Sequence, residues 1–385
     1  MKRAALVLVC LTMIGGVMLA GGAAQAGPGS SQTAIVSLGD SFISGEAGRW
    51  NGNSTNPFYT RNGTDRAAYN CKWWTYSCDY DAHRVYGTSY DNDCHRSDVA
   101  HIKSAAIAVN QKINLACSGA RTQHIWRASQ GGQVFKGEAP QADQLASVAA
   151  TYNVKLVVLT IIANDLGFAD HVIDCTVAWF AGAGPCYAQE QAEMNAAMAA
   201  AQNGLRKAID EIRAVMTSKG YSASQWKFVI AGYSSPIPTG ANIRYQPESN
   251  DDRWWSGGCP FYDADANWAK NTATPFIVNG MKQVAVEKGV QFLDVRDALN
   301  GHEVCHKSSS LVGSSGPNAA VHEWARWVNT GCCQGDAQES LHPNAFGQRA
   351  LGKCVQLMYA KTSGNWTCKN TPGQGYTAMT LTATS

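Results

Sequence analysis

The sequence predicts a three-layer α/β/α fold around a mostly parallel, five-stranded sheet. Two observations support this fold class: five short apolar runs rich in β-branched residues, and helical segments between or after several of them. Strands that alternate with helices build parallel sheets covered on both faces. In such sheets, ligands bind beyond the carboxyl ends of the strands. The five predicted strands are 34–38, 112–116, 154–162, 227–231 and 290–295.

Three segments are predicted to be helices. Residues 190–219 are rich in Ala, Glu, Gln, Met and Leu, and Gly220 supplies a stop signal. Residues 266–288 and 345–361 are also predicted to be helical. Each of these segments follows one of the last three predicted strands, as the alternating pattern requires.

The first 26 residues are predicted to be a secretory signal peptide. Lys2 and Arg3 form a basic start, residues 4–19 are largely apolar, and Ala24-Gln25-Ala26 is a small-x-small cleavage site. Small residues and glycines follow instead of a cluster of charges, which argues against an uncleaved membrane anchor. No later segment approaches the ~20 continuous apolar residues that span a bilayer. We therefore expect a secreted, extracellular protein without stable membrane insertion.

Cysteine content and charge agree with this expectation. Of 13 cysteines, Cys10 lies in the signal peptide, and the other 12 can form up to six disulfides in an oxidising compartment. Loss of Lys2 and Arg3 leaves 29 of the 31 basic residues, against 29 acidic ones. A mature chain with a net charge near zero gives no electrostatic argument for binding nucleic acid or an anionic membrane.

The length after the signal peptide is ample for one large core with elaborated loops, expected over residues 27–361, or for two domains. An insertion that is rich in Trp and turn residues spans about 45–93. Long loops inside a compact domain are usually functional or held by disulfides. Residues 362–385 form a C-terminal extension, and its Thr/Ala/Gly-rich end is expected to be a poorly ordered tail.

Four short motifs contain candidate catalytic residues, and three of them follow a predicted strand. Gly39-Asp40-Ser41 follows the first strand, Ala-Cys-Ser-Gly-Ala at 116–120 the second, and Ile-Ala-Asn-Asp-Leu at 162–166 the third. The fourth motif, Glu-Ser-Leu-His-Pro-Asn at 339–344, precedes the last helix. Because ligands bind at the carboxyl ends of parallel strands, these motifs are candidates for a shared site.

These motifs contain the groups that acyl transfer by a serine requires: a hydroxyl, a base, a group that orients the base, and donors for the oxyanion. Ser41 can supply the hydroxyl, His342 the base and Glu339 the orienting acid. The backbone N–H groups of Ser41 and Gly119, with the side-chain amide of Asn164, can supply the oxyanion donors. Glycine lets the backbone approach a substrate closely, and an amide needs no protonation to donate.

In this order, the four motifs resemble the SGNH (GDSL) hydrolase superfamily, in particular the secreted esterase, lipase and phospholipase enzymes of actinobacteria. The resemblance runs from about residue 34 to 359 and includes Ala231-Gly232-Tyr233 after the fourth strand. It implies an SGNH hydrolase domain with a flavodoxin-like sheet and no metal or other cofactor. It also implies that Ser41 is the nucleophile and His342 the general base. Gly119 and Asn164 would belong to the oxyanion hole.

Two positions depart from the family pattern. Ala163 stands where the family usually has glycine before the asparagine. Glu339 stands where the family usually has aspartate, and its extra methylene means that it must fold back to reach Nδ1 of His342. Some relatives use a backbone carbonyl in this role, and Asp336 is a further candidate with a less suitable spacing. The sequence therefore leaves three candidates for the group that orients His342.

The sequence also permits other interpretations. Ser41 could be only the N-cap of the following helix, and Asp40 is expected to tie the turn to the backbone. His302-Glu303-Val304-Cys305-His306 matches the His-Glu-x-x-His pattern of zinc proteases. That pattern needs a helix, whereas this segment follows Asn300-Gly301 and runs into a serine-rich stretch. The zinc interpretation is therefore not favoured.

The resemblance also implies a disulfide framework. Cys71 and Cys78 are in addition a natural local pair inside the Trp-rich insertion. Four cysteines then remain, and a direct link between two adjacent cysteines is awkward, so Cys332 and Cys333 are expected to reach Cys354 and Cys368. A metal cluster at these four is disfavoured by secretion. The pairs implied by the resemblance are Cys94–Cys117, Cys175–Cys186 and Cys259–Cys305.

These features together predict a secreted serine ester hydrolase of the lipase, esterase or phospholipase type. We expect a monomer that acts on small-molecule or lipid esters. An alternative is a carbohydrate O-acetyl esterase that acts on acylated carbohydrate, since Trp73-Trp74 and Trp254-Trp255 could stack on sugar rings. A third, from a different class, is a non-catalytic polysaccharide-binding protein on the same scaffold. The intact set of serine, glycine, asparagine and histidine argues against it.

Overall fold

A seven-stranded sheet forms the centre of the computed structural model, which describes residues 27–56, 61–246, 251–329 and 334–384. The strand order is β4-β1-β5-β6-β7-β8-β9, and all neighbouring strands are parallel except the last pair. The predicted signal peptide lies outside the described residues. In the described part of the chain, no helix is both long and apolar enough to cross a membrane.

All five predicted strands are present, and the predicted fold class is confirmed. Their spatial order, with the second strand in sequence outside the first and the rest following on the other side, is the doubly wound order of flavodoxin. The sheet has seven strands rather than the expected five, because the C-terminal extension adds two. The strands are β1 (Thr33–Gly39), β4 (Gln111–Asn114), β5 (Asn153–Thr160), β6 (Lys227–Ala231), β7 (Gln291–Asp294), β8 (Asn365–Lys369) and β9 (Thr380–Thr384).

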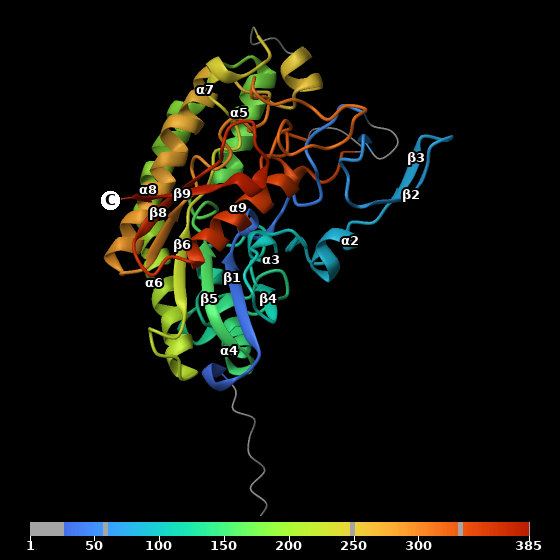
Figure 1. Cartoon of the computed structure of the whole chain (residues 1–385). Helices are drawn as coiled ribbons and strands as arrows, with labels where there is room; N and C mark the ends of the chain where they lie inside the picture. Colours follow the sequence, from blue (N-terminus) through green and yellow to red (C-terminus); the bar gives the residue numbers. More distant parts are fainter. Residues whose placement is uncertain (1–26, 57–60, 247–250, 330–333, 385) are drawn as a thin grey trace, which may run out of the picture.

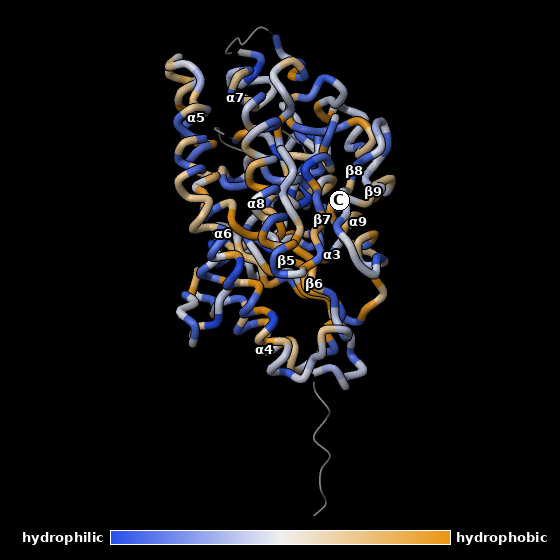
Figure 2. The backbone as a smooth tube through the Cα atoms, turned by 90° about the vertical axis from the view of Figure 1, so that its left-hand side faces the viewer, coloured by the Kyte–Doolittle hydropathy of each residue, from blue (hydrophilic) through white to orange (hydrophobic). Residues whose placement is uncertain are grey.

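Helices cover both faces of the sheet, as Figure 1 shows. On one face lie α3 (His101–Ser104) and α9 (Ala345–Tyr359); on the other lie α4 (Gln141–Thr151), α6 (Tyr187–Ser218) and α8 (Thr274–Glu287). The sheet is buried between them, so its central strands are almost entirely hydrophobic. Figure 2 shows this hydrophobic band where β5 and β6 are labelled. The remaining α-helices are α1 (Ser41–Ser44), α2 (His83–Tyr86), α5 (Phe168–Ala181) and α7 (Asp263–Trp268).

The C-terminal extension is an ordered part of the sheet, so the expectation of a poorly ordered tail is wrong. Its first strand, β8, continues the sheet in parallel to β7, and β9 pairs antiparallel with β8. The extension stays in place because Met379 and Cys368 are buried in the hydrophobic core. Its short strands gain their order from this tertiary packing rather than from a strong local pattern.

One predicted disulfide connection is also wrong. Cys354 on α9 bonds to Cys368 on β8, with Cα atoms 5.8 Å apart, instead of to Cys332 or Cys333. Helix α9 packs against β7 and β9, the two neighbours of β8 in the sheet, so Cys354 and Cys368 come within bonding distance. Cys332 and Cys333 lie outside the described residues.

The other four predicted disulfides are confirmed. Part of the Trp-rich insertion is a two-stranded hairpin, formed by β2 (Ala68–Lys72) and β3 (Ser77–Tyr80), which projects from the body (Figure 1). A disulfide closes this hairpin, and the remaining three brace loops around the core. The confirmed pairs are Cys71–Cys78, Cys94–Cys117, Cys175–Cys186 and Cys259–Cys305.

Candidate active site

A sharp turn presents Ser41 at the carboxyl end of β1. Gly39 has φ +139°, and a Cβ atom there would lie 1.9 Å from the carbonyl oxygen of Thr160 in β5, so only glycine fits. Asp40 is the N-cap of α1, since its Oδ1 accepts a 3.1 Å hydrogen bond from the Phe42 N–H. Ser41 is therefore the first helical residue and not the cap, and the expected role of Asp40 in the turn is confirmed.

His342 lies between Ser41 and a backbone carbonyl. Its Nε2 is 2.7 Å from Ser41 Oγ, and its Nδ1 is 3.0 Å from the carbonyl oxygen of Ser340. A carbonyl only accepts, so Nδ1 carries the ring proton and the neutral Nε2 can accept from the Ser41 hydroxyl. Burial lowers the pKa of His342 below its ordinary value of 6.5. The neutral form that can act as a base is therefore favoured at neutral pH.

Glu339 is fully buried beside this histidine but bonds to other groups. Its Oε2 accepts hydrogen bonds from Trp50 Nε1 at 2.7 Å and from the Asp336 N–H at 3.1 Å, and its Oε1 accepts from the Tyr86 hydroxyl at 2.6 Å. Its backbone carbonyl accepts a 3.3 Å hydrogen bond from the His342 N–H, but among the described residues its carboxylate makes no hydrogen bond with the His342 imidazole. The expectation that Glu339 orients His342 is therefore wrong.

Local helix geometry explains this position of Glu339. The short 3₁₀-helix Ala337–Glu339 begins with a capping box, in which the side chains of Asp336 and Glu339 each accept from the other's backbone N–H. This arrangement turns the carboxylate of Glu339 back toward the start of its own helix, and the next carbonyl, that of Ser340, faces the imidazole. Burial raises the pKa of Glu339 to about 7.

Gly119 and Asn164 line the same cavity as Ser41 and His342, so the structure brings all four predicted residues together. Gly119 has φ +84° and follows directly on the disulfide-braced loop after β4. The side-chain amide of Asn164 donates one 2.9 Å hydrogen bond to the Ala120 carbonyl. An amide nitrogen carries two hydrogens, so this bond fixes its orientation and leaves a second donor.

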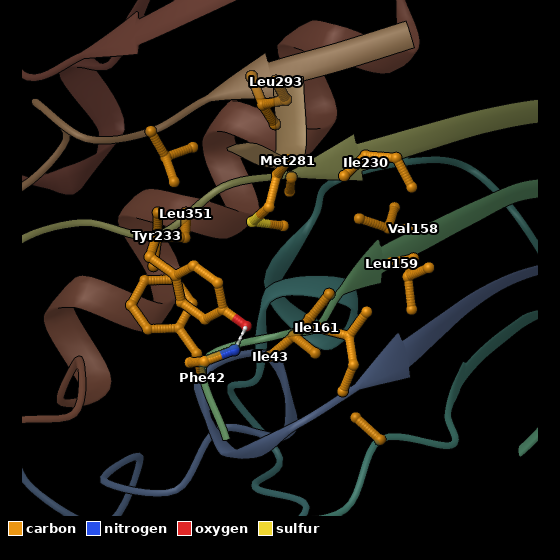
Figure 3. Close-up of a cluster of buried hydrophobic side chains, with 14 of the residues drawn as sticks. Phe42, Ile43, Val158, Leu159, Ile161, Ile230, Tyr233, Met281, Leu293 and Leu351 are labelled. Atoms are coloured by element: carbon orange, nitrogen blue, oxygen red, sulfur yellow. Dashed lines mark hydrogen bonds between the residues drawn. The ribbon is translucent and has the colours of Figure 1, made fainter. Parts of the chain in front are cut away.

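Tyr233, which the sequence gives only as a supporting motif, joins two of the loops that form the site. Its hydroxyl donates to Asp40 Oδ2 at 2.5 Å and accepts from the Ala163 N–H at 3.2 Å. Its ring meets Phe42 edge to face, with centroids 5.2 Å apart (Figure 3). Burial raises the pKa of Asp40 to about 7, whereas the bond from Tyr233 acts in the opposite direction. Tyr233 thus ties the serine turn to the asparagine turn.

A cavity of about 550 Å³ opens above Ser41 and His342. One wall is the helix α5, which the sequence did not predict, and the walls are mainly hydrophobic. Such a cavity accommodates an extended apolar group and excludes water from it. The hydrophobic residues of its lining include Phe168, Val172, Ile173, Val177, Ile277 and Leu341.

Comparison with known proteins identifies the family. The model of the GDSL-like Lipase/Acylhydrolase family matches residues 85–350, well over half of the chain. This protein belongs to the GDSL-like lipase/acylhydrolase family. As a member of this family, the GDSL hydrolase described here is an ester hydrolase. The matched range contains Gly119, Asn164 and His342, whereas Ser41 lies ahead of it and is brought to His342 by the fold.

Individual relatives of this GDSL hydrolase come from Streptomyces. Lipase 1 of Streptomyces coelicolor is 26% identical over 262 residues, which are 68% of this chain and 75% of the relative. The extracellular lipase of Streptomyces rimosus has a TM-score of 0.46 and 21% identity, over 86% of this chain and 100% of its own. Phospholipase A1 of Streptomyces albidoflavus has a TM-score of 0.48 and 21% identity, over 87% and 100%.

The segment that matches the zinc-protease pattern has other contacts in this hydrolase. It is not helical. The His302 ring stacks on Trp324, and its Nδ1 lies 2.9 Å from the His322 carbonyl oxygen. Glu303 forms an ion pair with Lys270 at 2.7 Å. The side chains of His302 and Glu303 therefore take part in the packing of a long loop.

Proposed function

We propose that this chain is a secreted serine esterase of the lipase type, which hydrolyses carboxylic esters with apolar acyl groups. The observation that carries the proposal is the 2.7 Å contact between Ser41 Oγ and His342 Nε2 at the base of a largely apolar cavity. A nucleophile within hydrogen-bond distance of a base, with the base oriented by a third group, is the arrangement that activates a serine.

In the proposed mechanism, Ser41 Oγ attacks the ester carbonyl while His342 Nε2 takes its proton. The carbonyl of Ser340 keeps the other ring proton on Nδ1 and stabilises the imidazolium that forms. The oxyanion accepts from the N–H groups of Ser41 and Gly119 and from the Asn164 amide. Ser41 offers an N–H because the first N–H groups of a helix have no intrahelical acceptor.

Collapse of this tetrahedral intermediate breaks the bond to the alcohol, which leaves with the proton from His342. Water then loses a proton to His342 and attacks the acyl-enzyme. A second collapse releases the carboxylic acid and returns the proton to Ser41 Oγ, so no other reactant is required. Loss of one oxyanion donor in such a site typically lowers turnover by roughly 10²–10³.

Two further observations bear on substrate and location. The hydrophobic walls of the cavity suit an acyl chain rather than an acetyl group on a polar sugar, and the relative Lipase 1 carries a lipase name. The signal-like residues 1–26 and the five disulfides of the described chain support secretion.

Hydrolysis of p-nitrophenyl esters by the parent and by Ser41→Ala tests the proposal. We expect a fall of at least about 10³-fold in kcat in a variant that still folds. A chain-length series should favour medium or long acyl groups. Retained turnover in Ser41→Ala would overturn the mechanism, and activity confined to acetyl esters would contradict the lipase assignment. Absence of fluorophosphonate labelling at Ser41 would instead favour a binding protein.

A further inference from the structure

The outer side of α5 carries an exposed apolar stripe. Ile173, Val177 and Phe180 are spaced i, i+4 and i+7 along this helix, so they lie on one face. Their side chains are 57%, 57% and 40% exposed. Large apolar residues that gather on one exposed face are unusual in a water-soluble domain and mark interaction sites.

A pair of tryptophans extends this stripe. The ring of Trp254 meets the ring of Phe180 edge to face, with centroids 4.5 Å apart, and stacks on the ring of Trp255, with centroids 4.2 Å apart. Trp255 is 68% exposed. Both tryptophans lie in the short segment Asp251–Ser256, which is remote from α5 in sequence. Below, the name rim patch denotes the four exposed residues Ile173, Val177, Phe180 and Trp255.

The rim patch is continuous with the substrate cavity. Ile173 and Val177 are exposed to solvent and also belong to the cavity lining, as do Val172 and Thr176 on the adjoining face of α5. One helix therefore forms both the wall of the cavity and the apolar surface beside its mouth. Figure 1 shows α5 at the end of the molecule toward which β1 and β5 point, where the site lies. A surface that covered the rim patch would meet the cavity mouth.

The charges on these two segments indicate which surface would fit. The exposed charged residues of α5 are Asp170 and Asp174, and the helix contains no Lys or Arg. The one basic residue of the tryptophan segment, Arg253, is buried and forms an ion pair with Asp263. Anionic membranes attract clusters of exposed basic residues. The exposed charged residues described on both segments, Asp170, Asp174 and Asp252, are all acidic, so this face disfavours an anionic bilayer and is compatible with one that has no net charge.

We propose that the rim patch docks the enzyme on the surface of a zwitterionic lipid bilayer, with the cavity mouth facing the lipid. The proposal rests on the lipase function proposed above and extends it from single ester molecules to lipid in aggregates. Tryptophan at the edge of an apolar patch suits the boundary between headgroups and acyl chains. An acyl chain would then pass from the bilayer along Ile173 and Val177 into the cavity without crossing water.

Binding in the absence of hydrolysis tests the docking step alone. The catalytically inactive Ser41→Ala protein is mixed with phosphatidylcholine vesicles, and the bound fraction is measured by sedimentation. The variant adds Phe180→Ser and Trp255→Ser, neither of which lines the cavity. The matched control adds Trp73→Ser and Trp74→Ser on the projecting hairpin, where the two rings are 68% and 63% exposed.

We expect vesicle binding to fall at least tenfold in the rim variant and less than twofold in the control. Equal binding by the rim variant and Ser41→Ala would overturn the proposal, and so would an equal loss in the hairpin control. Binding that requires phosphatidylglycerol in the vesicles would also contradict it. A loss of binding only to insoluble polysaccharide would show that the patch is a carbohydrate site instead.

Activity on a soluble substrate separates this proposal from the proposed function. With Ser41 intact, the Phe180→Ser, Trp255→Ser protein should hydrolyse monomeric p-nitrophenyl butyrate within twofold of the parent, which also confirms its fold. Against phosphatidylcholine vesicles, the same protein should lose at least fivefold in rate. If the parent hydrolyses neither p-nitrophenyl butyrate nor phosphatidylcholine, the proposed esterase function is wrong. If the parent hydrolyses both substrates and the variant hydrolyses the vesicles at the same rate, only the docking proposal is wrong.

Discussion

The Nδ1 atom of His342 lies 3.0 Å from the carbonyl oxygen of Ser340, two residues earlier in the same turn. The group that orients the histidine is thus part of the backbone, and its position depends on how the turn is folded. Leu341 has φ +57°, and the Arg326 backbone bonds to both Leu341 N–H and His342 C=O. The backbone around Arg326 therefore holds the turn that carries the Ser340 carbonyl in place.

Glu339→Gln distinguishes a structural carboxylate from a catalytic one. Because Glu339 bonds to Trp50 and Tyr86 rather than to His342, we expect kcat to fall by less than about tenfold, whereas the wrong tautomer in a Ser-His-Asp triad costs about 10⁴. The free energy of unfolding should fall by about 1–3 kcal/mol, since a buried acceptor is lost. Steady-state kinetics and urea unfolding measure the two effects, and a 10⁴-fold loss of kcat in a stable protein would restore Glu339 to the catalytic set.

The pH dependence of kcat/KM should reflect the depressed pKa of His342. Only the neutral imidazole accepts the proton of Ser41, and burial lowers the pKa of this group below 6.5. Activity should therefore be constant at neutral pH and fall as the pH drops through a midpoint below 6.5. A profile measured with a non-ionising ester checks this, and a midpoint above 6.5 would contradict it.

Gly39→Ala should damage both stability and activity. The new Cβ would lie 1.9 Å from the Thr160 carbonyl oxygen at φ +139°, so β1 and β5 must separate next to Ser41. We expect a loss of about 3 kcal/mol or more in unfolding free energy and a clear loss of kcat. Gly137→Ala is the matched control, because Gly137 has φ +77° and no atom within 4 Å of the new Cβ. That control should cost only about 1–2 kcal/mol from its dihedral angles; an equal effect at both positions would refute the steric argument.

Tyr233→Phe removes the hydroxyl that joins Asp40 to the Ala163 N–H. The ring and its packing on Phe42 are retained, so the change isolates the hydrogen bonds. We expect unfolding free energy to fall by about 1–3 kcal/mol because two buried groups lose a partner, and kcat to fall by about tenfold as the serine and asparagine turns loosen. An unchanged kcat would mean that the turns are held together by packing alone.

The Cys354–Cys368 disulfide should stabilise the fold without taking part in the site. Replacement of both cysteines by serine opens a loop of 14 residues, for which a loss of about 3 kcal/mol is expected. The kcat of the folded variant should stay within about twofold of the parent. Peptide mapping under non-reducing conditions verifies the link directly, and a bond from Cys354 to Cys332 or Cys333 would disprove it.

The sequence was most informative where chemistry belongs to a side chain. Ser41, Gly119 and Asn164 could be predicted because each proposed function needs a particular residue type just after a strand. His342 could be predicted from its motif ahead of the last helix. The resemblance left a backbone carbonyl as one candidate for orienting His342, but the sequence did not identify that of Ser340, because every residue carries a carbonyl and no spacing marks this one. The alternative interpretation of Ser41 as an N-cap is excluded by the structure, in which Asp40 caps the helix; the sequence alone did not decide this, since both Asp40 and Ser41 are good caps. Strands β8 and β9 were missed because their residues are mostly polar and become ordered only by pairing with β7.

A backbone group as the third partner of His342 also changes what natural variation can be tolerated at this site. Position 340 could change to almost any amino acid that accepts its dihedral angles, and the peptide oxygen would still be there. Position 339 then needs no acid to orient His342, and its residue is constrained instead by the buried hydrogen bonds from Trp50, Tyr86 and the Asp336 N–H. Surveys that require an acidic residue three places before the histidine would discard competent enzymes of this kind, whereas a search built on the fold of the turn would retain them.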